Sequence, residues 1–104
     1  MDMAQLQRVL DRFAVLDPQM PLHFIQTFLL VAAADSVTYR EIEEALSLTN
    51  SSVSRTLAAL GERHRTGNRG YALVDVFIDP GEGRRYRARL TKRGKALAQQ
   101  ITKD

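Results

Sequence analysis

Apolar residues recur at helical spacing along the first third of the chain. A first set lies three or four positions apart: Met3, Leu6, Val9, Leu10 and Phe13. This spacing predicts an amphipathic helix over residues 2–16 with one apolar stripe, which Pro18 and Pro21 separate from the next element. Between residues 20 and 34, apolar side chains occupy most of the helical circumference, so this second helix is expected to be buried on several sides.

Residues 38–62 carry the pattern of two short helices joined by a turn. Thr38 followed by Glu41 matches a capping box, in which each side chain bonds the backbone N–H of the other, and this predicts a helix over residues 39–46. Thr49 or Asn50 can cap the following helix. Its apolar residues repeat at helical spacing: Val53, Leu57 and Leu60. Two helices connected in this way form a helix-turn-helix.

The pattern changes to that of strands after residue 70. Residues 71–79 are rich in β-branched and aromatic side chains, and residues 80–83 hold turn-forming proline and glycine. Two sets of side chains alternate along residues 84–90: Arg85, Arg87 and Arg89 with Tyr86, Ala88 and Leu90. This alternation predicts the second strand of a hairpin. Thr91 can cap a last helix, with an expected inward face of Ala96, Leu97 and Ile101.

These elements predict an α+β fold in the order α-α-α-α-β-β-α, a winged helix-turn-helix whose two-stranded hairpin is the wing. A chain of 104 residues is long enough for one compact domain with a single core. Within residues 1–104 we assign 1–17 to an N-terminal helix, 38–62 to the helix-turn-helix, 71–90 to the wing and 91–104 to a C-terminal helix.

Charge is distributed unevenly along the chain. Residues 1–50 hold three arginines and seven acidic residues, whereas residues 51–104 hold twelve basic and five acidic residues. The first half therefore has a net charge of −4 and the second half one of +7. A positive region of this kind favours a polyanionic partner, although a solvated basic surface would give the same count.

Composition also narrows the expected setting of the protein. The absence of cysteine removes disulfides, thiol nucleophiles and thiolate metal ligands, and it fits a reducing, cytoplasmic location. The longest apolar stretch, residues 22–34, is interrupted by polar residues and is too short to span a bilayer, so no membrane partner is expected. The first residues carry Asp2 and Gln5 before any apolar run, which does not match an export signal.

The helix predicted from residue 50 to residue 62 has an outer face suited to DNA. With Val53 facing the core, a turn of 100° per residue places one set outside: Ser51, Arg55, Ala58, Ala59 and Glu62. The flanks hold Ser52, Ser54 and Thr56. Small side chains let a helix enter the major groove, and Arg55 can pair with guanine O6 and N7. An ordinary surface helix would tolerate the same residues, so this face alone leaves both interpretations open.

The predicted wing adds basic residues in a suitable place. Arg84 and Arg85 lie beside glycines at its tip, and paired arginines suit the negative potential of a narrow minor groove. Arg87 and Arg89 continue along the strand within expected reach of phosphates. Strand arginines also protect a sheet edge from aggregation. Their position after a serine-rich helix favours the DNA-binding interpretation.

Several of these segments resemble those of a known protein family. The run NSSVSRTLAAL, from Asn50 to Leu60, is similar to the recognition helix of the MarR-like winged-helix regulators. Three further pieces resemble that family's wing and following helix: Leu73-Val74, Asp79-Pro80 with Gly83-Arg84-Arg85, and Leu90-Thr91-Lys92-Arg93-Gly94. The resemblance covers residues 20–98 and implies a transcriptional regulator, usually a repressor, that binds pseudo-palindromic duplex DNA as a homodimer.

The resemblance also implies which residues meet DNA. Four would contact the major groove and two the minor groove: Ser51, Ser52, Ser54 and Arg55, with Arg84 and Arg85 at the wing tip. We expect four more residues to complete the interface: Thr38, Asn50, Thr56 and Arg87.

The chain departs from the family pattern in two places. Family members usually extend past the wing with long dimer-forming helices, whereas this sequence has one short helix there. The first helix could supply a dimer seam instead, or it could pack on its own domain. The polar stretch between Glu62 and Gly70 is longer than usual, and its arginines could contact DNA or only solvent: Arg63, Arg65 and Arg69.

The sequence argues against an enzyme and against a cofactor. His23 and His64 form no recognisable triad, metal cluster or phosphate loop with their neighbours. The acidic residues at 41–44 are interpreted as a capping group and a solvated helix face. No cofactor or metal is predicted, and the sequence leaves open whether a small-molecule effector binds. The serious alternative is a winged-helix module for replication, plasmid maintenance or protein–protein assembly, because a fold does not determine a function.

Overall fold

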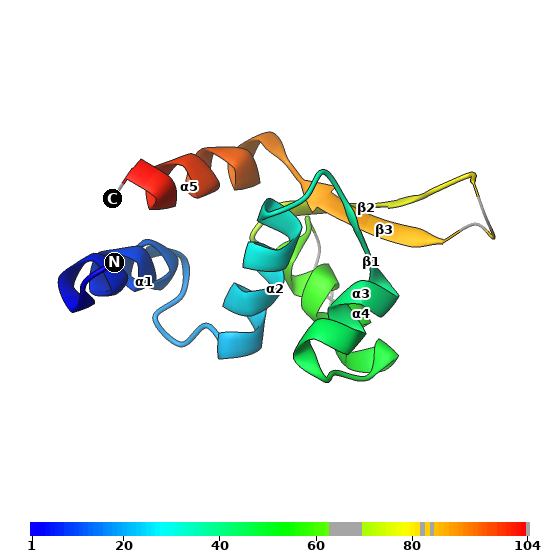
Figure 1. Cartoon of the computed structure of the whole chain (residues 1–104), viewed down its shortest axis with the longest axis horizontal. Helices are drawn as coiled ribbons and strands as arrows, with labels where there is room; N and C mark the ends of the chain where they lie inside the picture. Colours follow the sequence, from blue (N-terminus) through cyan, green and yellow to red (C-terminus); the bar gives the residue numbers. More distant parts are fainter. Residues whose placement is uncertain (63–69, 82, 84, 104) are drawn as a thin grey trace.

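The computed structural model describes residues 1–62, 70–81, 83 and 85–103. Its elements follow in the order α1 (Met3–Leu16), α2 (Leu22–Ala32), β1 (Val37–Thr38), α3 (Tyr39–Leu46), α4 (Asn50–Leu60), β2 (Val74–Ile78), β3 (Tyr86–Leu90) and α5 (Lys92–Lys103). Figure 1 shows α1 and α5 side by side at one end, where both termini lie. The helix-turn-helix of α3 and α4 and the projecting β2–β3 hairpin occupy the other end. The predicted winged helix-turn-helix is confirmed.

Side-chain caps define where the helices begin. Thr38 and Glu41 form the predicted capping box, with N···O distances of 2.9 and 3.1 Å. The bond from the Thr38 amide to the Glu41 carboxylate, with a smaller contribution from the Thr38 side chain, holds the pKa of Glu41 below its ordinary value. Thr49 caps α4, because its hydroxyl accepts from the Ser52 amide at 3.1 Å. Each cap satisfies an N–H that has no partner within the helix, so these boundaries follow from nearby residues.

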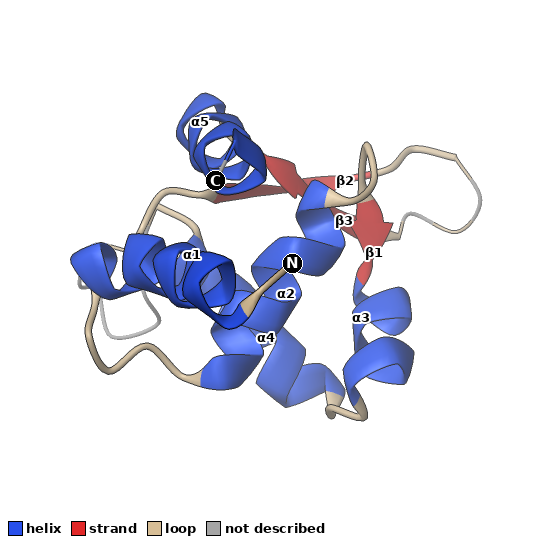
Figure 2. Ribbon diagram, turned by 60° about the vertical axis from the view of Figure 1, so that its left-hand side comes forward, coloured by secondary structure: helices blue, strands red, loops and turns tan. Residues whose placement is uncertain are grey.

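The core lies where α2 crosses the helix-turn-helix and the sheet (Figure 2). Phe28 of α2 is completely buried and meets Phe13 of α1 edge to face at 5.6 Å between ring centroids. Leu22 and Leu29 remain 66% and 43% exposed, so α2 is buried around less of its circumference than the sequence predicted. In the described parts of the chain, no helix is both long and apolar enough to cross a membrane.

The apolar stripe of α1 is divided between two environments. Val9 and Phe13 are buried against the core of the same chain. Met3, Leu6 and Leu10 are 76%, 40% and 39% exposed on the same helix. Part of the stripe therefore packs on its own domain, and the rest faces solvent in the single chain.

The sheet has one strand more than the sequence predicted. The order is β1-β3-β2, and both pairings are antiparallel. The additional strand β1 pairs Val37 with Ala88, and on its other side Ala88 lies opposite Val76. Two residues are too few to show an alternating pattern, and the partner strand lies about fifty positions away in the sequence. The two-stranded wing is therefore the outer part of a three-stranded sheet.

The segment at residues 70–73 closes the end of α4. Four of its amides donate to carbonyls in the last turn of α4 or just after it: Gly70 to Glu62, Tyr71 to Ala59, Ala72 to Gly61 and Leu73 to Leu60, at 2.8–3.0 Å. The strand predicted to begin at residue 71 starts only at Val74, because these amides satisfy helix carbonyls instead of a neighbouring strand. We call residues 70–73 the returning segment.

The start of α5 is fastened to the returning segment. The Thr91 hydroxyl donates to the Ala72 carbonyl at 2.7 Å and accepts from the Gly94 amide at 3.0 Å, as its predicted capping role requires. A Cβ atom on Gly94 would lie 2.1 Å from the Leu73 carbonyl oxygen, so only glycine fits there. Leu97 is buried and Ile101 half-buried, as predicted, but Ala96 is exposed. Ala98 takes the expected place of Ala96 beside the core.

Candidate nucleic-acid interface

The outer face of α4 is polar, small and exposed. The predicted contact residues Asn50, Ser51, Ser54 and Arg55 are all exposed, and Ser52 is half-buried on the flank. Together with Ala58, the four exposed residues line a shallow groove along the helix. Serine and alanine at these positions allow the helix to approach a partner closely, and Arg55 supplies a long cation in the middle of the face.

Two residues predicted for this surface belong to the core instead. Ala59 is 2% exposed, and its carbonyl accepts from the Tyr71 amide of the returning segment. Thr56 is 1% exposed, and its hydroxyl donates to the Ser52 carbonyl at 2.8 Å. The side chain of Thr56, which we expected to meet DNA, is thus buried and bonded within α4. Both residues are buried because α4 packs against the sheet side as well as against α2.

Thr38 has a structural role at the base of the site. It is 5% exposed and its hydroxyl accepts from the Glu41 amide. Its position in β1 also pairs it with Arg87 of β3. Thr38, which we expected to contact DNA, is thus nearly buried, and its hydroxyl is bonded in the cap of α3.

Basic residues of the wing occupy different environments. Arg84 lies outside the described residues, as do Arg63, Arg65, Arg69 and His64 of the stretch between α4 and β2. Arg85 is exposed. Arg89 donates to Asp75 Oδ2 at 3.2 Å, and its guanidinium lies 4.2 Å from the ring centroid of Phe77.

Among the wing arginines that the structure describes, Arg87 is the most enclosed, with its side chain 29% exposed. Its Nε donates to Asp79 Oδ2 at 2.9 Å, and Nη1 donates to the Ser36 hydroxyl at 3.2 Å. The Gly81 amide also donates to Asp79, and this bond, with that of Arg87, holds the pKa of Asp79 below its ordinary value. Ser36, Asp79 and Arg87 form what we call the wing clamp. Although we expected Arg87 to contact DNA, its donors here tie the wing to the turn before β1.

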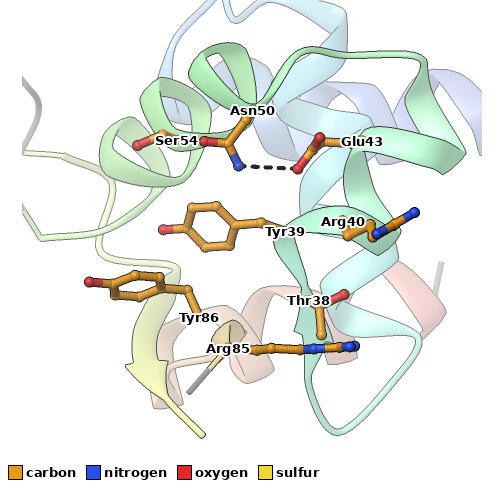
Figure 3. A pocket seen from close by; sticks show the side chains of 8 residues that line it. All are labelled: Thr38, Tyr39, Arg40, Glu43, Asn50, Ser54, Arg85 and Tyr86. Carbon is orange, nitrogen blue, oxygen red and sulfur yellow. Dashed lines mark hydrogen bonds between the residues drawn. The ribbon is translucent and has the colours of Figure 1, made fainter. Parts of the chain in front are cut away.

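A hollow of about 610 Å³ lies between the helix-turn-helix and the part of the wing where β3 begins (Figure 3). Its walls are Thr38, Tyr39, Arg40, Glu43, Asn50, Ser54, Arg85 and Tyr86. The rings of Tyr39 and Tyr86 lie 5.8 Å apart with an angle of 41° between their planes. Burial, and to a lesser degree the neighbouring Tyr86, raises the pKa of Tyr39. Asn50 Nδ2 donates to Glu43 Oε2 at 3.1 Å across the upper wall.

Sequence reasoning missed the part that Tyr39, Arg40, Glu43 and Tyr86 play in this hollow. Tyr39 is the first residue of α3 and Tyr86 the first of β3. They come together because β1 pairs with β3, and that strand was not predicted. The sequence indicated this hollow only through a tyrosine at the first position of α3 and another at the first position of β3.

Comparison with known proteins identifies the fold. No protein-family model matches the chain, and no curated protein matches its sequence. Among solved structures, Rv1404 from Mycobacterium tuberculosis aligns with a TM-score of 0.72 and 20% identity, covering 96% of this chain and 63% of the other.

Two DNA complexes give similar alignments. A cysteine-to-serine mutant of E. coli MarR complexed with operator DNA has a TM-score of 0.69 and 18% identity, covering 96% of this chain and 64% of the other. The S. aureus MepR–DNA complex has a TM-score of 0.68 and 22% identity, covering 96% and 72%. The chain thus spans just under two thirds of the first two proteins. At these identities the similarity shows a shared fold, the MarR-like winged helix.

Proposed function

We propose, from its MarR-like winged-helix fold, that this chain is a cytoplasmic transcriptional regulator that binds double-stranded DNA sequence-specifically. In this proposal α4 enters the major groove, the wing enters the adjacent minor groove, and binding represses transcription. The observation that carries the proposal is the exposed face of α4: Asn50, Ser51, Ser54 and Arg55. MarR and MepR bind DNA in the solved complexes that share this fold.

Each part of the interface has a distinct task. Arg55 reads a base, because a guanidinium can bond guanine O6 and N7 together. Ser51 and Ser54 offer hydroxyls to phosphates and base edges. Arg84 and Arg85 of the wing supply positive charge to the minor groove. The net charge of +7 in residues 51–104 provides the attraction that brings the duplex to this surface.

The active form in this proposal is a homodimer on a pseudo-palindromic site. Met3, Leu6 and Leu10 of α1 are partly or largely exposed, at the end of the molecule remote from the wing. Two copies that bury these residues against each other would present two α4 helices to one duplex. Two half-sites spaced by about one helical turn would then be read together.

Binding measurements test the function. Fluorescence anisotropy would compare a duplex from upstream of the protein's own gene with a scrambled duplex, at two salt concentrations. Preference for the upstream duplex at both salts is the expected result. Equal, salt-sensitive binding would contradict a sequence-specific regulator and favour a replication or plasmid-maintenance module, and binding to neither would favour protein–protein assembly.

Substitution of Arg55 tests the base-reading role. Arg55→Ala is expected to cost about 1–3 kcal/mol on the preferred duplex and to relax preference at one base position. Arg8→Ala removes the same charge from an exposed site on α1, and serves as the control. If both variants lose equal affinity, or if Arg55→Ala binds as the original chain does, Arg55 is not a base contact.

A further inference from the structure

The hollow beside Tyr39 and Tyr86 is continuous with the groove along α4. Asn50 and Ser54 line both surfaces. The opposite wall of the hollow is the wing where β3 begins, at Arg85 and Tyr86. The hollow therefore lies between the two parts of the molecule that we propose to enter the major and minor grooves.

Duplex geometry determines what must cross this position. The major and minor grooves are separated by a sugar-phosphate backbone, so a protein with one element in each groove straddles that strand. The strand carries one negative charge per phosphate, and side-chain hydroxyls commonly bond its oxygens. A surface between α4 and the wing is thus expected to meet phosphates and no base edges.

Three hydroxyls are arranged for this contact. Ser54 comes from α4, Tyr39 from the start of α3 and Tyr86 from the start of β3, and all three line the hollow. Figure 3 shows their oxygens pointing to the same side of the hollow. We call these residues the hydroxyl row. The raised pKa of Tyr39 keeps its phenol protonated, and hence a donor, far above neutral pH.

Charged groups around the hollow are compatible with a bound phosphate. Arg85 and Arg40 line it, and Arg40 is paired with Glu44 at 3.1 Å only in a highly exposed contact. Glu43 is the acidic residue of the wall, and Asn50 donates to it at 3.1 Å. In Figure 3 its carboxylate lies on the opposite side of Asn50 from Ser54, and the guanidinium groups of Arg40 and Arg85 also extend away from the three hydroxyl oxygens.

We infer that the hydroxyl row binds the phosphate backbone that separates the two grooves, and so sets the position of α4 relative to the wing on DNA. This inference rests on the proposed function. It assigns Tyr39 and Tyr86 to sequence-independent affinity, whereas Arg55 is assigned to sequence preference.

The test uses Tyr39→Phe, Tyr86→Phe and the double variant, with a duplex selected from a random pool by the original protein and a scrambled duplex. Loss of each hydroxyl should weaken binding about fivefold on both duplexes. The preference between duplexes and the salt slope should not change, because an uncharged phenol displaces no counterion. Tyr71→Phe is the matched control, because its hydroxyl donates to Asp17 away from the hollow and should not affect binding.

Phosphate-ethylation interference gives an independent result. Ethylation of adjacent phosphates on the strand between the two grooves should weaken binding of the original chain. Ethylation at these phosphates should no longer affect binding of the double variant, whereas ethylation at other contacted phosphates should still weaken it. Tyr86→Phe alone supports the same comparison if the double variant is less stable, since Tyr86 is 54% exposed.

Each outcome separates this inference from the function on which it rests. If the phenylalanine variants bind as the original does, while Arg55→Ala loses preference, the hydroxyl row is wrong and the function stands. If the variants lose preference instead of overall affinity, the hydroxyls read bases and the inference is overturned. If the original chain binds neither duplex, both proposals fail.

Discussion

The helix-turn-helix and the wing are held in place by different forces. Helix α4 buries Val53, Leu57 and Leu60 at 0–1% exposure, and caps satisfy its first amides. In the hairpin, Val74 and Ala88 are buried near the base, whereas Ile78 and Tyr86 toward the tip are more than half exposed. Beyond its base the wing is held by the backbone pairing of β2 with β3 and by polar contacts between side chains.

This difference separates stability from orientation. Burial of apolar surface stabilises α4 in one position, so the residues on its outer face can differ without moving the helix. The direction of the wing relative to β1 depends on the wing clamp, which is accessible to water, whereas the Asp75–Arg89 pair joins two residues within the hairpin. Exposed ion pairs contribute little to global stability, but they can define a geometry. The five predictions below test this separation.

The largest effect is expected in the core under the helix-turn-helix. Phe28→Ala removes a completely buried ring that contacts Phe13, and should lower the free energy of unfolding by about 3–5 kcal/mol. Urea denaturation measures this change. Leu22→Ala on the same helix is the control, since Leu22 is 66% exposed and its loss should change stability by less than about 0.5 kcal/mol. Equal losses would mean that α2 is not packed as described.

The wing clamp should affect DNA affinity more than stability. Asp79→Ala and Asp75→Ala remove the same charge from the hairpin, so charge alone predicts tighter DNA binding by both. Loss of Asp79 also frees Arg87 and the Gly81 amide, and should weaken binding roughly tenfold despite the added positive charge. Anisotropy titrations compare the pair. Tighter binding by both variants would show that the clamp does not orient the wing.

Arg87 itself distinguishes a positioning role from a DNA contact. Arg87→Met should weaken binding while leaving the slope of log affinity against log salt unchanged. If the guanidinium contacts a phosphate, the slope should fall by about 0.9. Arg87→Lys should not restore affinity, because an ammonium cannot reproduce the separate bonds from Nε and Nη1.

A smaller effect is expected in the returning segment that joins the two regions. The Tyr71 hydroxyl donates to Asp17 Oδ2 at 2.8 Å, and burial, with this contact, raises the pKa of Tyr71 to about 12. Because the protonated phenol is the bonded form, its stabilisation is complete below pH 10 and is lost as pH rises from 10 to 12.

Tyr71→Phe should therefore lower the Tm by about 2–4 °C at neutral pH. The difference from the original chain should shrink progressively above pH 10. Thermal melts of both proteins at several pH values measure this difference in Tm. Titration of the remaining tyrosines and lysines affects both proteins equally, so it does not change the difference. A difference that stays constant to pH 11.5 would contradict the bond to Asp17.

The smallest effect is expected at Ala72, whose φ of 57° is in the left-handed region. Ala72→Gly removes the steric cost of that conformation but increases the entropy of the unfolded chain, so stability should rise by at most about 0.5 kcal/mol. Ala45→Gly in the exposed face of α3 is the control and should cost about 0.5–1 kcal/mol. A loss at both sites would mean that Ala72 is not strained.

Features with local causes were predictable from the sequence. The Thr38–Glu41 capping box and the helix start at Thr49 depend on residues three positions apart, and both occur as predicted. The same spacing at Asp2 and Gln5 forms a further capping box that the sequence analysis overlooked. The exposed face of α4 followed from helical periodicity once Val53 was placed inside.

Features that depend on distant partners were not predictable in this way. Ala59 and Thr56 are buried because the returning segment and the sheet cover a second side of α4, which periodicity alone cannot indicate. The start of β2 moved to Val74 for the same reason. The hollow requires the pairing of β1 with β3, which brings Tyr39 and Tyr86 together across 47 positions of sequence.

The bonds of the returning segment also determine which parts of the molecule unfold locally together, as amide hydrogen exchange would detect. The amides of Tyr71, Ala72 and Leu73 lie outside any helix or strand, yet each bonds a carbonyl at the end of α4. Such amides exchange with solvent only when the helix end itself unravels. Their exchange rates should therefore match those of the last turn of α4 and be far slower than those near the exposed end of β2. In kinetic terms, the amides of residues 71–73 belong with the end of α4.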